Sequence, residues 1–494
     1  MRGKAIRGNS NQDTACRCHS VPWSATIRRR LPHPPLETQA RRLCYSMVAM
    51  KEAAISIVRR LREAGHTAYF NGGCVRDMVR GVEPHDYDIA TSATPDQVQQ
   101  LFSKTVPVGA QFGVVLVLDG GHQFEVATFR SDEAYLDGRR PTSVRYGSPE
   151  EDAQRRDFTI NGLFYDPIEG RFIDFVKGRA DIERKQVRTI GEPRQRFTED
   201  KLRLLRCIRF ATNLGYDIES ATFDAVKEMA GQIQLVSAER IRDELIKTLT
   251  RSHAGRGLEL LRASGLLTEV LPEIAAMQGI EQPPEFHPEG DVFTHTRMML
   301  DALPPHPSVT LAFAVLLHDV GKPPTFERAP DRIRFNEHDR VGAEMAETIL
   351  RRLRFSNDET DRIVLCVREH MRFQFVKEMR PAKLKRILAR ETFPDELELH
   401  RIDCAASHRN LENYEFLKAK VAEMPPEVMK PAPLLTGHDL LALGLKPGPT
   451  VGQILREAEE MQLEERLKSR AEALEFAKSR VTAAREPPNG GVAI

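Results

Sequence analysis

The spacing of apolar positions changes several times in the first third of the chain, and each change predicts a different element. From residue 48 apolar side chains recur every three to four residues and stop at Gly65, which predicts an amphipathic helix. The run AYFNGG at 68–73 predicts a buried strand leading into a Gly-Gly turn, followed by a helix from Val75 to about Gly81. GVVLVLD and QFEVATFR flank the turn-like DGGH, so we expect a β-hairpin over 113–130.

Longer periodic segments predict helices farther along the chain. EEDAQRRDFTINGLFYDP at 150–167 predicts a helical stretch whose apolar side holds Ile160, Leu163 and Phe164. FTEDKLRLLRCIRFATNLGY at 197–216 predicts one strong helix, with Thr198 as N-cap and two acids in its first turn. After the proline-rich 425–433, a Gly/Pro turn leads into an amphipathic C-terminal helix.

The overall composition is that of an ordinary soluble protein. The 494 residues are 41% hydrophobic and 29% charged, and about 150 residues per domain suggests three or four domains. No apolar run approaches the length of a membrane span. The formal net charge of +1 means that any nucleic-acid footprint must be local. Seven cysteines, an odd number, do not form a disulfide framework in so long a chain and indicate the reducing cytoplasm.

Shifts in composition divide the chain into six segments. Residues 1–46 carry nine Lys or Arg against two acids and have no apolar periodicity, so disorder is expected, although an organellar leader or a later start codon would look alike. The other expected segments span 47–190, 191–285, 286–425 and 426–485, and the end at 486–494 should be disordered.

Two aspartates one residue apart, Asp86 and Asp88, carry the first chemical hypothesis. If Tyr87 lies on a strand, alternation places both carboxylates on one face, roughly 7 Å apart. Gly72 and Gly73 precede a helix start, where backbone amides can approach an anion. Such a pair suits two magnesium ions that bridge the phosphates of a nucleotide. The alternative is a surface strand with two solvated aspartates.

Further polar residues could complete such a site. Glu125 lies among apolar residues of a predicted central strand, where it is a third carboxylate or an edge residue facing water. An Arg beside an Asp, with an Asn four residues later, occurs at 155–161; the residues are Arg155, Arg156, Asp157 and Asn161. They could hold a triphosphate and a sugar hydroxyl, or they could form an ion-paired helix face. Asp200 and Arg203 present acceptors and donors together, which suits the edge of a nucleobase, or they form a simple helix salt bridge.

The second half contains histidines and aspartates spread over several predicted helices. His318 and Asp319 end an apolar helix, and further candidates arrive from other segments: His295, His338, His370 and Asp403. Such a set can form one or two divalent-metal sites, whereas a single core histidine would not. Residues 368–390 hold eight Lys or Arg against two acids, which favours a phosphate-binding surface near His370 or a solvated charged helix.

Five ordered motifs together resemble the bacterial tRNA nucleotidyltransferase and poly(A) polymerase family, the class II branch of the polymerase-β-like nucleotidyltransferases. The motifs are GGCVRD, HDYDIATSATP, FEVATFR, RRDFTINGLFYDP and EDKLRLLRCIRFA. The resemblance covers about residues 50–285. It implies an α+β fold, in which a head with a small mixed sheet precedes all-helical neck, body and metal-binding domains. It also implies that the four segments are a catalytic head at 47–190, a helical neck and body at 191–285, a helical metal-binding domain at 286–425 and a helical tail at 426–485.

The resemblance also implies roles for individual residues. Asp86 and Asp88 would bind the two catalytic Mg²⁺ ions, with Glu125 as the third carboxylate. Triphosphate and ribose would be held by Gly72, Gly73, Arg76, Arg156, Asp157 and Asn161. Glu199, Asp200 and Arg203, with Arg206 on the same helix, would recognise the incoming CTP or ATP in place of a template. VSAERIRDEL, with Glu239 and Arg240, resembles a motif that stabilises the neck.

Residues 287–410 resemble the HD phosphohydrolase superfamily in the order of their metal-binding residues. The order is His295, His318, Asp319 and Asp403, with His338 and His370 as additional ligands. Some tRNA nucleotidyltransferases carry such a domain, with activity on 2′,3′-cyclic phosphates or nucleotide phosphates. The implied cofactor is a second divalent ion: Mg²⁺, Mn²⁺, Ni²⁺ or Fe²⁺. The alternative is a helical domain that mainly supports tRNA.

Three hypotheses follow for the function. The first is an enzyme that adds CCA to the 3′ end of tRNA from CTP and ATP. It is favoured over poly(A) synthesis because VPVGAQFGVVLV lacks the basic pair after glycine that we associate with the poly(A) branch. CC-adding and A-adding enzymes share the same motifs. The third hypothesis, from another class, makes the metal-dependent phosphohydrolase the principal enzyme and the head an RNA-binding module.

Overall fold

The computed structural model describes residues 36–108, 113–132, 144–285 and 287–485. The leader predicted for 1–46 lies outside these residues up to residue 35, as does the disordered end predicted for 486–494. From Leu36 the chain is helical, so α1 (Leu36–Glu63) begins inside the segment that we expected to be disordered. The chain divides into two compact units, Met1–Glu52 and Ala53–Ile494, and the packing described here lies within the second.

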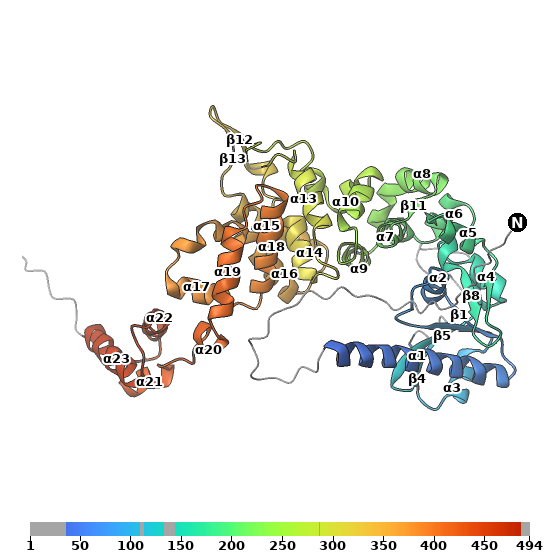
Figure 1. Ribbon diagram of the computed structural model, residues 1–494, viewed down its shortest axis with the longest axis horizontal. Helices are drawn as coiled ribbons and strands as arrows, with labels where there is room; N and C mark the ends of the chain where they lie inside the picture. Colours follow the sequence, from blue (N-terminus) through green and yellow to red (C-terminus); the bar gives the residue numbers. More distant parts are fainter. Residues whose placement is uncertain (1–35, 109–112, 133–143, 286, 486–494) are drawn as a thin grey trace, which may run out of the picture. The chain divides into compact units, whose positions relative to one another are not determined.

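A seven-stranded mixed sheet forms the head (Figure 1), in the order β3-β4-β5-β2-β1-β8-β9. Only β2 and β5 pair in parallel; the other neighbours are antiparallel. The strands are β1 (Ala68–Asn71), β2 (Asp88–Thr91), β3 (Thr105–Val106), β4 (Val114–Asp119), β5 (His122–Thr128), β8 (Leu163–Asp166) and β9 (Arg171–Asp174). The predicted hairpin at 113–130 is confirmed as β4 and β5.

The register of β2 decides where the acidic residues lie. Asp88 stands opposite Asn71 on β1, and Ile89 stands opposite Val126 on β5, so the parallel register continues with Asp88 beside Glu125. Along β5, Phe124 and Val126 are buried on one face, whereas Glu125 is exposed on the other. Glu125 therefore lies on the exposed face of β5, the strand next to β2.

Helices and short strands surround the sheet and lead out of the head. Phe129 and Phe164 pack edge to face at 5.9 Å between ring centroids within its core. The surrounding elements are α2 (Gly73–Val79), α3 (Pro95–Leu101), β6 (Arg130–Asp132), β7 (Val144–Tyr146), α4 (Pro149–Gln154), η2 (Thr159–Asn161), α5 (Gly178–Glu183) and β10 (Gln186–Val187).

The helix predicted over 150–167 is wrong in its second half. Helix α4 ends at Gln154, the single turn η2 follows, and Leu163 and Phe164 belong to β8, which pairs with β1 and β9. A short apolar run fits a buried strand as well as a buried helix, and here sheet pairing decides.

The single helix predicted over 197–216 is also wrong, because the chain breaks at Asp200–Leu202. Thr198 lies inside α6 (Pro193–Glu199) and does not cap a helix start, and α7 (Arg203–Leu214) begins anew. Asp200 has extended backbone angles, and its carboxylate accepts a hydrogen bond from the Leu202 amide at 3.1 Å. This side-chain turn competes with helix continuation.

The rest of the described chain is mostly helical (Figure 1, green to red). Residues 217–275 form β11 (Asp217–Ile218), α8 (Ser220–Met229), η3 (Ala230–Leu235), α9 (Ala238–Leu249), α10 (Ala254–Ala263), α11 (Leu266–Val270) and α12 (Pro272–Ala275). Residues 292–388 form α13 (Val292–Asp301), α14 (Val309–Leu317), η4 (Pro323–Thr325), β12 (Phe326–Arg328), β13 (Ile333–Phe335), α15 (His338–Arg352), α16 (Asn357–Glu369), η5 (His370–Glu378) and α17 (Pro381–Leu388). The last elements are α18 (Phe393–Ala406), α19 (Glu412–Glu423), α20 (Pro426–Met429), α21 (Gly437–Ala442), α22 (Pro449–Leu463) and α23 (Arg470–Arg485).

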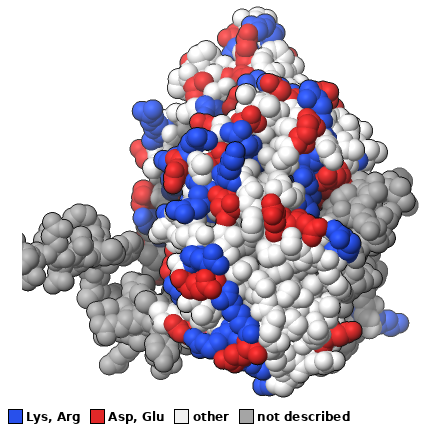
Figure 2. All heavy atoms as spheres, turned by 90° about the vertical axis from the view of Figure 1, so that its right-hand side faces the viewer, with Lys and Arg blue, Asp and Glu red and all other residues white. Residues whose placement is uncertain are grey.

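Surface charge is mixed. Figure 2 shows Lys and Arg interspersed with Asp and Glu on the face that it draws, as the formal net charge of +1 leads us to expect. None of the helices in the described part of the chain has the length and apolar character that crossing a lipid bilayer requires.

Candidate functional sites

Three carboxylates lie together at the beginning of β2. Asp88 opens the strand, Asp86 lies in the loop before it, and Glu125 comes from β5. The strand does not include Tyr87, so the predicted alternation does not hold as stated, yet Asp86 still lies close enough to act on Asp88. Burial, followed by the charges of Asp86 and Glu125, raises the pKa of Asp88 to about 7, against the opposing charge of Arg156.

The carboxylates have no positive partner of their own. Within the described residues none of Asp86, Asp88 and Glu125 forms an ion pair with a Lys, Arg or His side chain, since each of the ion pairs found there joins other residues. Mutual repulsion of three oxygen-bearing groups is relieved by a bound divalent cation, and carboxylate oxygens are the ligands that Mg²⁺ prefers. The donor set therefore fits magnesium.

A glycine turn faces the carboxylates. Gly72 has φ +72°, and a Cβ added there would lie 3.3 Å from the Arg156 guanidinium and 4.0 Å from the Asp88 carboxylate. A side chain at this position would therefore be strained and would crowd both groups. Helix α2 begins at the next residue, so its first amides open on the same space.

Arginines form the opposite wall of the same cavity, whose volume is about 540 Å³. Arg76 donates to the Asn161 side chain at 3.0 Å, and Arg156 donates to Asn71 at 2.8 Å and pairs with the buried Asp152 at 2.8 Å. These contacts hold two guanidinium groups in fixed positions beside the carboxylates.

Asp157 is the buried anchor of this wall. It accepts hydrogen bonds from the Arg206 Nε at 2.7 Å and from the Asn161 amide at 3.2 Å. Burial opposes its ionisation, but the charge of Arg206 outweighs it and lowers the pKa of Asp157 to about 2. Arg206 and Arg209 both lie over the Phe210 ring, at 5.3 Å and 4.1 Å from its centroid. Asp157 is therefore ionised and orients its neighbours.

The residues expected to recognise a base lie in the same cavity but pair differently from the prediction. Asp200 forms its ion pair with Arg240 on α9 at 2.8 Å, and Arg203 pairs with Glu199 at 2.6 Å. The break between α6 and α7 separates Asp200 from Arg203, so the expected contact within one helix does not form. Arg240, Asp152 and Arg209 are site residues that we did not assign there from the sequence.

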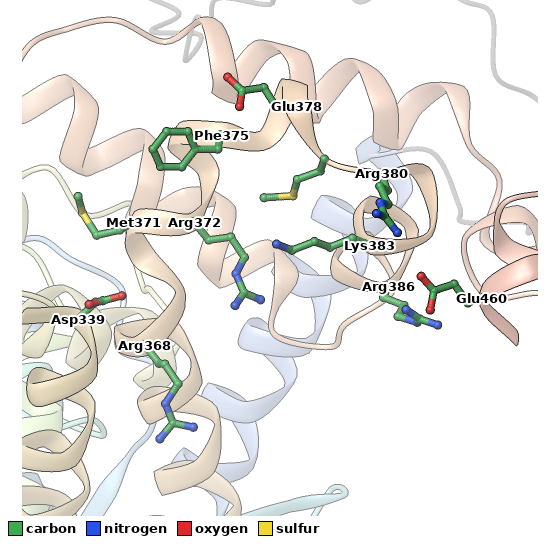
Figure 3. A pocket seen from close by; sticks show the side chains of 11 residues that line it. Asp339, Arg368, Met371, Arg372, Phe375, Glu378, Arg380, Lys383, Arg386 and Glu460 are labelled. Carbon is green, nitrogen blue, oxygen red and sulfur yellow. The ribbon is translucent and has the colours of Figure 1, made fainter. Parts of the chain in front are cut away.

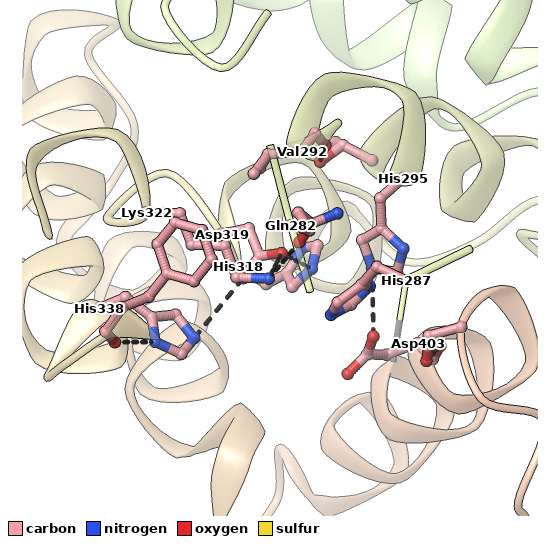
Figure 4. Close-up of polar contacts among 12 residues, drawn as sticks. Gln282, His287, Val292, His295, His318, Asp319, Lys322, His338 and Asp403 are labelled. Carbon is pink, nitrogen blue, oxygen red and sulfur yellow. Dashed lines mark hydrogen bonds and ion pairs between the residues drawn. The ribbon is translucent and has the colours of Figure 1, made fainter. Parts of the chain in front are cut away.

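A second cluster joins histidines from four elements around Asp319 (Figure 4). His318 is the C-cap of α14, as the apolar helix ending in His-Asp predicted. In three histidines Nδ1 lies within hydrogen-bond distance of a backbone carbonyl: 2.9 Å from Val315 for His318, 2.8 Å from Phe335 for His338 and 2.6 Å from Val367 for His370. Because carbonyls only accept, each Nδ1 is the donor and each Nε2 carries a lone pair.

The free Nε2 atoms converge on carboxylate oxygens. Those of His338 and His370 are 3.2 Å apart and lie 3.6 Å and 3.9 Å from one Asp319 oxygen, and that of His318 lies 3.1 Å from the other oxygen. Burial, and then the neighbouring His338, lowers the pKa of His370 to about 4. Two lone pairs that face each other repel unless a proton or a metal ion lies between them, and the imidazole and carboxylate groups gathered here fit a divalent metal.

His295 forms the other side of the cluster. Its Nε2 lies 3.2 Å from Asp403, and its Nδ1 lies 2.6 Å from Glu289. The buried Nε2 atoms of His295 and His318 have no partner in hydrogen-bond geometry, and Figure 4 shows His338 and His295 on opposite sides of Asp319. Without a metal ion a proton takes the cation's place: burial opposes it, but Asp403 and Glu289 raise the pKa of His295 to about 9.

Four residues of this cluster were missed in the sequence. Lys322 pairs with Asp319 at 2.7 Å and donates to Gln282 at 2.7 Å, so a buried ammonium shares the charge of Asp319. His287 and Glu289 lie beside His295 and form a potential ligand triple with it. The HDVGK segment contains Lys322, but nothing in the sequence pattern near residue 287 indicated that this loop folds onto α13.

Close packing of two glycines fixes His338 relative to His318 and Asp319. A Cβ at Gly321 would lie 2.1 Å from the His338 carbonyl oxygen and 2.6 Å from the Gly342 amide nitrogen. We expect Gly321→Ala to lower stability by about 1–3 kcal/mol and to weaken metal binding, because backbone must move apart. Thermal unfolding and Mn²⁺ titration measure both effects.

Gly437→Ala is the matched control, since nothing lies within 4 Å of a Cβ at that position. It should change neither quantity. Equal metal affinity in the Gly321 variant and the wild-type chain would show that the glycine contact does not position the cluster.

Family comparisons match three parts of the chain. Residues 68–188 match the poly A polymerase head domain, residues 215–278 match the probable RNA and SrmB-binding site of polymerase A, and residues 339–477 match the tRNA nucleotidyltransferase domain 2. The first of these ranges contains the carboxylate cluster.

Curated relatives and solved structures agree on the same class of protein. The CCA-adding enzyme of Streptococcus pyogenes serotype M3 is 42% identical over 213 residues, which are 43% of this chain and 53% of the relative. The chain thus matches about half the length of that relative.

Two solved structures cover most of the chain. The Bacillus stearothermophilus CCA-adding enzyme in complex with CTP has a TM-score of 0.65 at 25% identity and covers 88% of this chain and 98% of its own. The Thermotoga maritima CCA-adding enzyme complexed with tRNA has a TM-score of 0.52 at 18% identity, covering 87% and 94%. The predicted fold class, a polymerase-β-like head followed by helical segments, is confirmed.

Proposed function

From the head-domain match and the carboxylate cluster, we propose that the chain is a template-independent RNA nucleotidyltransferase that adds C, C and A to the 3′ end of tRNA from CTP and ATP. The observation that carries the proposal is the placement of Asp86 and Asp88 in one cavity with the Gly72 turn and the arginines, with Glu125 close enough to raise the pKa of Asp88. The names of the relatives support this choice of product. Cys74, Cys207, Cys366 and Cys404 are buried and unpaired, which supports a cytoplasmic location.

The carboxylates and the arginines would have separate roles in nucleotidyl transfer. Asp86, Asp88 and Glu125 would hold Mg²⁺, which lowers the pKa of the attacking 3′-hydroxyl and stabilises the leaving pyrophosphate. Arg76 and Arg156, fixed by Asn161 and Asn71, would hold the triphosphate. The 3′-oxygen forms a bond to the α-phosphorus as the bond to pyrophosphate breaks, so the protein contributes positioning and charge neutralisation.

Base recognition would use the two ion pairs beside the phosphate wall. Asp200, Arg203 and Arg240 line the same cavity, where Asp200 pairs with Arg240 and Arg203 is held by Glu199. A base edge that accepts from a guanidinium or donates to a carboxylate takes over part of the hydrogen bonding of these pairs, so the charged groups keep hydrogen-bond partners. The Glu199–Arg203 pair spans the α6–α7 break, which makes the break part of the proposed recognition site.

Incorporation of labelled CTP and ATP into a tRNA that lacks its 3′ CCA tests the proposal. Addition of two C and one A, with no further growth, is the expected result. A long ladder from ATP alone would identify a poly(A) polymerase, and termination after CC, or A added only to a tRNA ending in CC, would identify the CC-adding or A-adding alternatives. No incorporation with Mg²⁺ would contradict all of these.

A second candidate function is favoured by the histidine lone pairs that converge on Asp319. We propose an HD-type phosphohydrolase site formed by His295, His318, Asp319, His338, His370 and Asp403. A divalent ion held there (Mg²⁺, Mn²⁺, Ni²⁺ or Fe²⁺) would activate a water molecule for attack on phosphorus. In a 2′,3′-cyclic phosphate, the water oxygen bonds to phosphorus, one ribose–phosphate bond breaks, and the ribose oxygen takes up the proton.

A further inference from the structure

A basic cavity lies beside the histidine cluster, over α15, η5 and α17 (Figure 3). Its volume is about 760 Å³. Five cationic side chains line it: Arg368, Arg372, Arg380, Lys383 and Arg386. Three carboxylates line it as well. Figure 3 shows Arg372 and Lys383 reaching into the same space from η5 and α17. Such a concentration of positive charge is unusual on a chain whose formal net charge is +1.

Three of the five cations lack an acidic partner. Arg372 pairs with Glu369, and Arg386 lies 3.6 Å from Glu459, but Arg368, Arg380 and Lys383 form no ion pair within the part of the chain that the structure describes. Most arginines of the neighbouring helices are paired, as Arg351 is with Glu347 on α15. Unpaired cations gathered in one cavity repel each other, and an anion relieves this cost.

An exposed aromatic ring stands among these cations. Phe375 on η5 is 61% exposed and lines the cavity. An exposed ring beside cations offers a surface on which a nucleobase can stack. The combination of a charged groove and a stacking ring is that of single-stranded nucleic-acid sites.

The cavity adjoins the one that contains the metal-ligand cluster. Met371 lines both this cavity and the 590 Å³ cavity that contains Asp319, His338, His370 and Asp403. Asp339 follows His338 directly, and Arg368 lies two residues before His370. A chain of phosphates bound along the cations would thus lead to the cluster.

We infer that this cavity binds the phosphodiester backbone of a single-stranded RNA end, with a base on Phe375 and the terminal phosphate at the histidine cluster. The inference deepens the proposed phosphohydrolase and rests on it for the terminal group only. We favour a polymer substrate over a free nucleotide. The three unpaired cations come from α16, from the segment after η5 and from α17, and a single phosphate does not need three cations.

Two matched sets of variants test the inference in the full chain. The cavity set is Arg368→Ala, Arg380→Ala and Lys383→Ala combined, and Phe375→Ala alone. The control set is Arg351→Ala, Lys418→Ala and Lys478→Ala combined, which removes the same charge from exposed positions outside the cavity. The probes are a single-stranded RNA of about ten nucleotides ending in a 2′,3′-cyclic phosphate and the corresponding cyclic mononucleotide.

The cavity substitutions should change the binding of the oligonucleotide and leave that of the mononucleotide unchanged. We expect Phe375→Ala to raise its KM by roughly 5- to 150-fold, which is the stacking contribution of one base. The triple variant should reduce the salt dependence of binding by about two units of slope, since each phosphate contact contributes about 0.7. The KM for the mononucleotide and the incorporation of CTP should stay unchanged. A 4-thiouridine in the oligonucleotide should cross-link to η5 or α17.

Failure of this inference and failure of the phosphohydrolase are distinguishable. Equal effects of the cavity and control sets on oligonucleotide binding would overturn the inference even if both probes are hydrolysed. Absence of hydrolysis of either probe would contradict the phosphohydrolase alone, because binding, its salt slope and the cross-link are measured without turnover. A cross-link that falls only on the head would also overturn the inference.

Discussion

Replacing Asp88 by asparagine is expected to reduce CTP and ATP incorporation by roughly a thousandfold or more, because the reaction loses a charge on which its electrostatic stabilisation depends. Asp88 begins β2 between Asn71 and Glu125, and its pKa of about 7 reflects burial and two neighbouring carboxylates. A neutral amide of the same shape keeps the strand but cannot hold a divalent ion as a carboxylate does. Asp86→Asn should have a comparable effect.

The same substitution should not destabilise the head. A raised carboxylate pKa means that folding disfavours the ionised form, so stability contributed by the protonated form is fully present at low pH and is lost as pH rises through the folded value of about 7. In EDTA at pH 8, the Asp88→Asn variant should therefore unfold at the wild-type temperature or above it.

Asp119→Asn at the end of β4 is the control, since it lies in the same sheet but outside the arginine-lined cavity. It should keep full incorporation. Substantial incorporation by both the Asp86 and Asp88 variants, or an equal loss in the Asp119 variant, would contradict the assignment of the head as the transferase site.

Replacing His318 by alanine should abolish metal binding and cyclic-phosphate hydrolysis while leaving CCA addition intact. Its Nε2 is buried beside Asp319 and makes no hydrogen bond, so no other partner competes for it. Loss of even an outer partner of a ligand commonly weakens metal affinity 10- to 100-fold, so loss of a ligand should exceed about a hundredfold. Calorimetric titration with Mn²⁺ and hydrolysis of 2′,3′-cyclic AMP measure the two effects.

His438→Ala is the control, because this exposed residue of α21 lies outside the cluster. It should change neither metal binding nor hydrolysis. If the wild-type chain hydrolysed phosphates without incorporating nucleotides, and His318→Ala removed this activity while Asp88→Asn did not, the alternative hypothesis would hold: the phosphohydrolase would be the principal enzyme and the head an RNA-binding module.

Sequence periodicity predicted elements well where pairing is local. The β4–β5 hairpin needs only a short turn between two alternating runs, and the apolar helix ending at His318 needs no distant partner. Periodicity predicted the wrong element where contacts between residues distant in the sequence decide the secondary structure. Leu163 and Phe164 form a strand because β1 lies beside them, about 90 residues earlier in the chain, and no local preference separates the two outcomes.

The same distinction holds for the sites. The types of residue at the carboxylate cluster could be identified from the motifs, but the pairing of Asp200 with Arg240 could not, because 40 residues separate them and the helix break at Asp200 turns the side chain toward α9. Glu289 and His287 escaped notice for a related reason: their loop is irregular, and only folding brings it to His295.

The strand order of the head also sets when the carboxylates come together during synthesis. Strand β2 lies between β1 and β5, so Asn71 emerges from the ribosome before Asp88, whereas Glu125 on β5 emerges well after it. Parallel pairing and pairing across long sequence separations are slow steps, because the loop must close before contacts form. Arg156, whose charge opposes the rise in the pKa of Asp88, comes later still. A nascent chain therefore carries Asp86 and Asp88 before Glu125 and Arg156 can reach them, and the site is completed only after these residues emerge.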